Sequence, residues 1–310
     1  MKKFFPLLAL ILTLACTAAA ADGLSVDSLT VTYVTAPLNV PSIVEKEYGL
    51  FAEALGVPVN YAEIMSGADQ TQALASGDVQ LLYAVGGTSV ILSAANGADI
   101  KVLNMYSRAP KAFCLYSKDD SLTSPESLKG KTIAGPAGTN LHELLVAYLA
   151  TAGMTITDVN YVSMGIPESK AALDSGSADV AMLGGAAAYN AAKQGYHLVT
   201  DGEGLIQAII AVAVTEAFYN AHPDVIEKLM EAQQGIMARI DEDPDSAFAI
   251  TAKYLDMDAG AVKEMYSCYD FSPEISDADI AGFQKTADFM AASGMIEEPY
   301  DVNGLFLPRD

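Results

Sequence analysis

Two stretches of this chain share one pattern of residues, and this internal repeat limits the fold more than any other feature. Residues 72–89 have the sequence QALASGDVQLLYAVGGTS, and residues 171–188 have the sequence AALDSGSADVAMLGGAAA. In each copy an Ala-Leu pair precedes Ser-Gly, an Asp-Val step follows, and a short apolar run ends in Gly-Gly. The common order and similar spacing indicate one structural unit that is used twice.

The glycines of the repeat predict its local structure. Each Ser-Gly predicts the end of a helix, because glycine adopts the left-handed C′ conformation at little cost. Each Gly-Gly is predicted where a strand meets the next helix, so that backbone amides face a ligand there. The repeat therefore predicts two similarly built α/β lobes with a ligand cleft between them.

The composition fits an ordered protein that does not bind nucleic acid. The chain has 310 residues and a hydrophobic content of 51%, which is enough for one large or two medium cores. Its formal net charge is −22, from 39 acidic and 17 basic residues, so no basic surface is expected that would neutralise phosphates. A small anionic ligand remains compatible with this charge, because helix N-termini act locally.

Residues 1–21 are predicted to be an export signal, with two lysines followed by an apolar run that is too short to span a bilayer. Two ends of this segment fit the sequence. Ala19-Ala20-Ala21 suits ordinary cleavage, whereas Leu14-Ala15-Cys16 resembles a lipobox in which Cys16 is lipidated and anchors the protein to the membrane. Both predict an exported protein in the periplasm or cell envelope. Loss of the two lysines takes the formal charge from −22 to −24.

The sequence predicts neither a metal site, nor a cofactor, nor catalysis. Beyond Cys16 it has only Cys114 and Cys268, whose pairing the sequence leaves open, and three histidines. It contains no Gly-x-Ser-x-Gly elbow, His-Glu-x-x-His pair or phosphate-binding P-loop.

Strand and helix patterns alternate along most of the chain, which favours mainly parallel sheets with covering helices. Ser42 and Glu45 fit a capping box at the start of the first helix, and Ser66-Gly67-Ala68-Asp69 opens a later one. After residue 216 the chain is predicted to be helical. Besides the strand in each copy of the repeat, the predicted strands cover residues 29–34, 57–64, 100–106, 113–117, 132–135, 159–162, 195–199 and 206–215.

The chain resembles the substrate-binding proteins of ABC importers, in the nitrate, sulfonate, taurine and thiamine-precursor group. The residues that carry the resemblance are EYGLF at 47–51, both copies of the repeat, LKGK at 128–131, and Gly138-Thr139 followed by His142. The resemblance covers nearly the whole mature chain, roughly residues 29–294.

This resemblance implies the α/β fold of periplasmic binding proteins, in which two lobes close on a ligand around a hinge. One lobe is expected to comprise residues 27–112 plus 212–310, and the other residues 113–211. The implied function is capture of a small organic anion such as a sulfonate and its delivery to a membrane permease and its ATPase. The sequence leaves two alternatives open: a neutral heteroaromatic ligand such as a thiamine pyrimidine precursor, or a sensor module of the envelope.

The rule that ligands bind beyond the carboxyl ends of strands, together with the resemblance, selects the candidate ligand-binding residues. Gly138-Thr139 is the strongest signal, because related binders have Gly-Ser or Gly-Thr where a helix N-terminus holds the anionic head of the ligand. The candidates are Asn39, Ser66, Asp69, Gly87, Thr88, Ser89, Arg108, Gly138, Thr139, Asn140, His142, Ile166 and Gly185.

Several candidates have a second, purely structural role that also fits the sequence. Thr88 and Ser89 either present hydroxyls to an anion or cap a helix. Asn39 either points into the cleft or bonds to its own turn. Arg108 either binds a ligand carboxylate or sulfonate or pairs with one of the many acids. His142 either contacts ligand or packs under its turn.

Two features bear on the choice of ligand. Asp69 would repel a simple anion but would suit a cationic or amino group. Tyr83, Tyr106 and Phe113 would either wall the cleft for an aromatic ligand or pack in the core.

Overall fold

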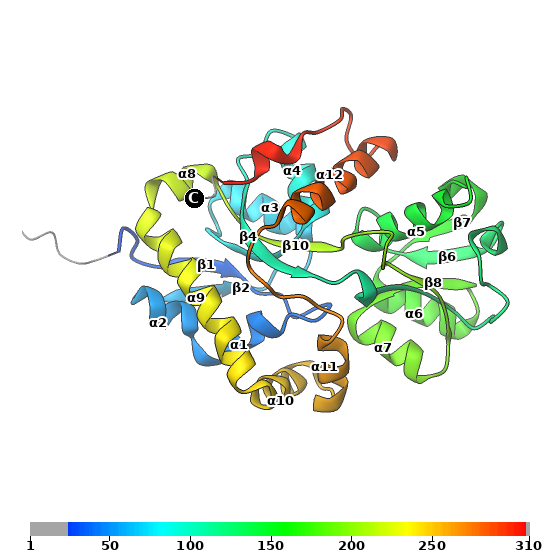
Figure 1. Cartoon of the computed structure of the whole chain (residues 1–310), viewed down its shortest axis with the longest axis horizontal. Coiled ribbons are helices and arrows are strands. Elements are labelled where there is room, and N and C mark those ends of the chain that lie inside the picture. Colours follow the sequence, from blue (N-terminus) through cyan, green and yellow to red (C-terminus); the bar gives the residue numbers. More distant parts are fainter. Residues whose placement is uncertain (1–23, 308–310) are drawn as a thin grey trace, which may run out of the picture.

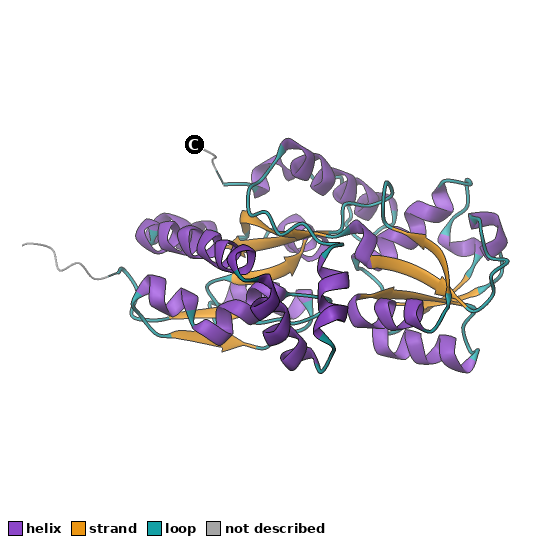
Figure 2. Ribbon diagram, turned by 60° about the horizontal axis from the view of Figure 1, so that its bottom comes forward, coloured by secondary structure: helices purple, strands orange, loops and turns teal. Residues whose placement is uncertain are grey.

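The structure is a computed structural model that describes residues 24–307. The predicted export signal and Cys16 therefore lie outside the described residues. Two α/β lobes lie side by side, as Figure 1 shows, with helices on both faces of the strands in each lobe (Figure 2). Within residues 24–307, no helix combines the length and the apolar content that a membrane crossing needs.

The first lobe contains five strands in two sheets. A two-stranded sheet, β1-β2, is joined by a parallel bridge between Val31 and Leu81 to a three-stranded sheet, β3-β10-β4. These strands are β1 (Leu29–Thr32), β2 (Val59–Ala62), β3 (Leu82–Gly86), β4 (Lys101–Arg108) and β10 (Ile209–Val214).

The second lobe contains one five-stranded sheet with the order β7-β6-β8-β5-β9. Its strands are β5 (Phe113–Ser117), β6 (Thr132–Gly135), β7 (Asn160–Ser163), β8 (Val180–Gly184) and β9 (His197–Asp201). When the Val31–Leu81 bridge is counted, the strand order in the first lobe is β2-β1-β3-β10-β4. This order corresponds strand for strand to that of the second lobe. In both lobes the first three strands are parallel and the fourth, β10 or β5, is antiparallel to its neighbour.

The internal repeat accounts for this correspondence. The first copy ends one helix, forms β3 and starts the next helix, and the second copy does the same around β8. The predicted helix ends are confirmed, because Gly77 and Gly176 follow their helices with φ of 82° and 78°. The predicted fold class, two α/β lobes of the periplasmic-binding-protein type, agrees with the structure. The exact lobe boundaries remain a prediction.

Most of the C-terminal third of the chain forms helices that belong to the first lobe. They are α1 (Val40–Tyr48), α2 (Leu50–Leu55), α3 (Gly67–Ser76), α4 (Gly87–Ala95), α8 (Glu216–Ala221), α9 (Pro223–Glu242), α10 (Pro244–Leu255), α11 (Ala259–Tyr266) and α12 (Asp277–Ala292). The second lobe has α5 (Asn140–Ala150), α6 (Ile166–Ser175) and α7 (Gly185–Lys193).

Alternation along the central strands explains why both faces of each sheet are covered. In β3 and just before it, Leu81 and Tyr83 pack into one apolar cluster with α9, while Leu82 between them packs into another with α4 and α12. The same two-residue period in β8 divides its side chains between two clusters.

The predicted capping box at Ser42 and Glu45 is wrong. The helix α1 starts three residues earlier than predicted, at Val40 with Asn39 as its N-cap, and a proline follows in its first turn, where it needs no amide hydrogen. Ser42 is instead buried and hydrogen-bonded to the Tyr106 hydroxyl at 2.9 Å. The Glu45 carboxylate is also buried and accepts a hydrogen bond from Tyr61.

Candidate functional site

Six helices begin where parallel strands end: α1, α3 and α4 in the first lobe, and α5, α6 and α7 in the second. A side chain caps only one of them, since Ser66 accepts a hydrogen bond from the Asp69 amide at the start of α3. The other five helices have no side-chain hydrogen bond at the N-cap, and three of their N-caps are Gly86, Gly165 and Gly184.

Four of the five described helices after β10 differ in this respect, whereas α9 also starts without a side-chain cap. Side chains cap α8, α10, α11 and α12, through Thr215, Asp243, Asp258 and Ser276. Uncapped helix starts leave main-chain N–H groups without acceptors, and the helix dipole adds positive potential at the same place. The strand-end edges of the two lobes are therefore suited to receive an anion.

The two strand-end edges meet at Pro37 and Gly185. Pro37 lies in the turn between β1 and α1, and Gly185 is the first residue of α7. A methyl group on Gly185 would lie 2.2 Å from the carbonyl oxygen of Pro37, and its φ is +57°. Both the close approach and the backbone conformation therefore require glycine at this contact between the lobes.

In the first lobe, the turns before α3 and α4 lie together. A methyl group on Gly67 would lie 2.1 Å from the Ser89 hydroxyl oxygen, so Ser89 reaches the start of α3. Thr88 is buried, and Gly87 packs closely against Phe283 of α12. Asp69 is exposed.

In the second lobe, His142 supports the turn that precedes α5. The Gly138 amide donates to His142 Nδ1 at 3.2 Å, and the imidazole stacks on the Tyr161 ring with centroids 5.2 Å apart. Burial lowers the pKa of His142. The Thr139 hydroxyl donates to the Pro136 carbonyl at 3.0 Å, so its proton is already engaged. The first amides of α5 are therefore the donors that this turn offers to a ligand.

The remaining two candidates of the second lobe start helices. Asn140 is buried as the first residue of α5, and Ile166 is partly buried as the first residue of α6.

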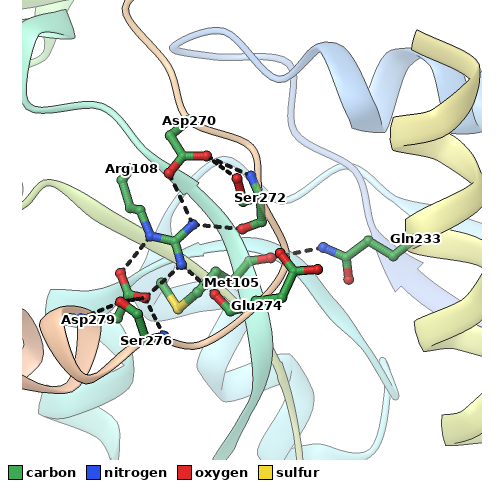
Figure 3. A network of polar contacts seen from close by, with 8 residues as sticks. All are labelled: Met105, Arg108, Gln233, Asp270, Ser272, Glu274, Ser276 and Asp279. Carbon is green, nitrogen blue, oxygen red and sulfur yellow. Dashed lines mark hydrogen bonds and ion pairs between the residues drawn. The ribbon is translucent and has the colours of Figure 1, made fainter. Parts of the chain in front are cut away.

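Arg108 was expected either to bind the ligand or to pair with an acidic residue, and the structure shows the pairing (Figure 3). Its assignment to the ligand is therefore corrected. Its Nε and Nη2 donate to the two carboxylate oxygens of Asp279, at 2.5 and 2.7 Å. Its Nη1 and Nη2 also donate to the main-chain carbonyls of Ser272 and Glu274, and Asp270 lies 3.7 Å from Nη1. The guanidinium is thus occupied by protein acceptors.

The pKa of Asp279 agrees with this pairing. Burial would raise the pKa of the carboxyl group, but hydrogen bonds from Arg108 and Ser276 outweigh burial and hold it below its ordinary value.

Asn39 and the predicted aromatic walls are also structural. The Asn39 amide donates to the carbonyls of Val34 and Ala36, at 2.9 and 3.2 Å, within its own turn. Tyr83, Tyr106 and Phe113 are buried in the core, and the rings of Tyr83 and Tyr106 pack edge to face. These side chains make contacts within the protein.

The sequence reasoning did not select Glu143, which lies one turn after Thr139 in α5. Its side chain is buried, and Thr286 of α12 donates to Glu143 Oε1 at 2.9 Å across the two lobes. The available signal was an acidic residue four positions after the predicted anion-binding residue, in a helix that is mostly apolar.

A cavity of about 230 Å³ lies beside Gly185, between α7 and α11. Cys114 and Cys268 both line this cavity. The sequence left open whether they form a disulfide, and in the structure both are free thiols. Among residues 24–307, no cluster of acidic, histidine or cysteine side chains is arranged to hold a metal ion.

A family model described as NMT1/THI5 like matches residues 37–247, which is more than half of the chain. This chain belongs to the NMT1/THI5-like family. The resemblance predicted from short motifs is thereby confirmed.

Relatives of this chain include proteins that are named as binding proteins. The taurine-binding periplasmic protein of Escherichia coli is 30% identical over 69% of this chain and 68% of its own length. The putative aliphatic sulfonates-binding protein of the same organism is 25% identical over 79% of this chain and 77% of its own length. The crystal structure of the periplasmic aliphatic sulphonate binding protein SsuA from Escherichia coli superposes with a TM-score of 0.82 at 20% identity, covering 92% of this chain and 94% of that one.

Proposed function

We propose that this NMT1/THI5-like protein is the extracytoplasmic solute-binding component of an ABC importer and that it captures a small organic sulfonate. The observation that carries this proposal is the set of five uncapped helices at the facing edges of the two lobes. A sulfonate has three acceptor oxygens and one negative charge, which several main-chain amides can satisfy together.

The glycine N-caps support the same ligand class. A side chain at Gly86, Gly165 or Gly184 would compete with the ligand for the first amides of its helix. The net charge of −22 does not oppose binding, because most of these charges are screened from the cleft at physiological ionic strength.

The heteroaromatic ligand is the weaker alternative. That ligand was expected to stack on tyrosines, but Tyr83 and Tyr106 are core residues. Its expected polar partners were Asp69 or Asn39, and the amide of Asn39 bonds to its own turn, whereas Asp69 is exposed.

The cleft has a binding role and no catalytic role in this proposal. The sequence relatives named above are binding proteins, and export through residues 1–21 would place the chain in the same compartment. Lipidation of Cys16 is the further proposal for membrane attachment. Incorporation of labelled fatty acid into the wild-type chain, and its loss in Cys16→Ser, would support that anchor.

A ligand screen by thermal unfolding, followed by calorimetry, tests the proposed function. The panel contains alkanesulfonates, nitrate, carboxylates and pyrimidines, each added to the mature protein. A ligand present at 100 times its Kd adds about 2.7 kcal/mol to the free energy of unfolding. A shift with sulfonates supports the proposal, and a shift with pyrimidines alone contradicts it in favour of the heteroaromatic ligand.

A further inference from the structure

A cavity of about 630 Å³ lies in the first lobe, bounded by β4, α8, α9 and the segment between α11 and α12. Its volume falls within the range of small-molecule sites, about 300–1,000 Å³. Among the described residues, none that lines it belongs to the second lobe or to the strand-end turns. The lining residues are Leu103, Asn104, Tyr219, Pro223, Ile226, Glu227, Met230, Gln234, Pro273, Glu274, Ile275 and Leu307. The cavity is therefore separate from the proposed sulfonate site.

Asn104 of β4 brings to this cavity a hydrogen-bond acceptor that has no donor. Gln233 of α9 donates from Nε2 to the Met105 carbonyl at 2.9 Å (Figure 3), which leaves its Oε1 to face Asn104. Asn104 Nδ2 donates to Gln233 Oε1 at 2.5 Å. These two bonds fix the orientation of both amides. Asn104 Oδ1 is then buried without a hydrogen-bond partner among the described residues.

The unpartnered oxygen indicates a missing donor in the cavity. Only 6% of Asn104 is exposed, and a buried acceptor without a donor is costly. Asn104 lines the cavity, whereas Gln233 does not. The nitrogen of the Asn104 amide is thus directed to Gln233, and the oxygen is the end available to a molecule in the cavity. That molecule must carry an N–H or O–H group.

The charged residues of the cavity wall select the charge of such a molecule. Both of them, Glu227 of α9 and Glu274, are acidic and exposed. Neither forms an ion pair within residues 24–307. The nearby guanidinium of Arg108 is already paired with Asp279. The ring of Tyr219 adds an aromatic face, which also attracts cations. The wall therefore favours a cation over an anion.

We propose that this cavity binds a small organic amine with an apolar body. The protonated amine donates to Asn104 Oδ1, and the carboxylates of Glu227 and Glu274 supply the opposite charge. The apolar body packs against Ile226 and Met230, on the side of α9 that lines the cavity. This site and its ligand class are independent of the ligand that binds between the lobes.

Calorimetry of the mature protein with three ligands tests the chemical class. The ligands share one apolar body and are 4-phenylbutylamine, its N,N,N-trimethyl derivative and 4-phenylbutyrate. Only the primary amine has both a positive charge and an N–H donor. We expect it to bind at least tenfold more tightly than the trimethyl derivative, which cannot donate to Asn104. The carboxylate should show no measurable binding, because both lining charges are negative.

Two charge-reversal variants test the location of the site. Glu227→Lys and Glu231→Lys change exposed residues one turn apart in α9 and make the same change in net charge, but only Glu227 lines the cavity. Glu227→Lys should weaken binding of 4-phenylbutylamine at least tenfold, whereas Glu231→Lys should stay within threefold of wild type. Asn104→Leu, which removes the acceptor at similar volume, should abolish the preference for the primary amine. If Asn104→Leu does not fold, the ligand series and the lysine variants decide the matter.

Four outcomes overturn the inference. They are absence of amine binding by wild type, equal affinity for the primary and trimethyl amines, an equal effect of the two lysine variants, and binding that appears only after deletion of residues 308–310. The third would place the amine elsewhere, and the fourth would indicate that the end of the chain itself fills the cavity. None of them bears on the proposed sulfonate site, which shares no lining residue with this cavity.

Discussion

Arg108, at the end of β4, and Asp279, in the first turn of α12, are joined by two hydrogen bonds of 2.5 and 2.7 Å. The same guanidinium also binds the main-chain carbonyls of Ser272 and Glu274. One arginine thereby fixes the segment between α11 and α12 against β4 (Figure 3). Because α12 also carries Thr286 to the lobe contact, the position of this helix depends on Arg108.

Replacement of Arg108 should therefore affect stability more than ligand binding. Removing one partner of a buried ion pair leaves the other charge uncompensated, and we expect Arg108→Ala to lower the free energy of unfolding by about 3 kcal/mol. Urea denaturation measures this change, and calorimetry with a sulfonate should give a Kd within threefold of wild type. A stable variant with lost affinity would return Arg108 to the ligand site.

Gly185→Ala should weaken ligand binding by preventing the approach of the lobes. The new methyl group would lie 2.2 Å from the Pro37 carbonyl oxygen, so the two turns must separate. Gly195→Ala is the matched control, because its φ of +78° carries similar backbone strain while no atom lies within 4 Å of the added group. Both variants should lose about 1–2 kcal/mol of stability. Only Gly185→Ala should raise the Kd, by at least tenfold, and an equal effect of both on Kd would contradict the contact's role.

The sequence predicted those features that local rules determine. Gly77 and Gly176 end their helices as the repeat indicated, and α3 begins within residues 66–69 as predicted, because these outcomes depend on residues within one or two turns. The fold class followed from the repeat for the same reason. Each copy specifies a helix end, a strand and a helix start, and its position in the sheet then follows.

The roles of Arg108 and Ser42 could not be predicted in this way. Arg108 bonds to a residue 171 positions away, and Ser42 bonds to Tyr106 across 64 positions. In a chain with many acidic and polar residues, each of these two side chains could form hydrogen bonds with several partners. Which partner it contacts depends on the tertiary structure. Glu143 was missed for a related reason, since its burial depends on α12 from the other lobe.

Gly86→Asp should stabilise its own helix and abolish sulfonate binding there. Gly86 is the uncapped N-cap of α4, with a φ of −63° and a ψ of 137° that any residue can adopt. An aspartate would cap the first amides and place a negative charge where the sulfonate is expected, so the Kd should rise at least tenfold while stability changes by a few tenths of a kcal/mol. Gly86→Ala, whose methyl group would meet no atom closer than 3.6 Å, should bind normally. Equal affinities of the two variants would exclude α4 from the site.

Stability should fall as pH rises through the window set by two buried carboxyl groups. Burial raises the pKa of both Glu45 and Glu143 from 4.5 to about 7. Between these values the folded protein binds more protons than the unfolded chain, so the free energy of unfolding decreases from about pH 4.5 to pH 7 and then levels off. Each group contributes at most about 3 kcal/mol of this loss.

Urea denaturation of wild type and of the Glu45→Gln, Glu143→Gln double variant at pH 5 and pH 8 isolates the effect. The variant should show a smaller loss between the two values, because glutamine does not titrate. Parallel curves would mean that both carboxyl groups titrate normally, and Glu143 Oε2, which has no hydrogen-bond partner among the described residues, would then be solvated.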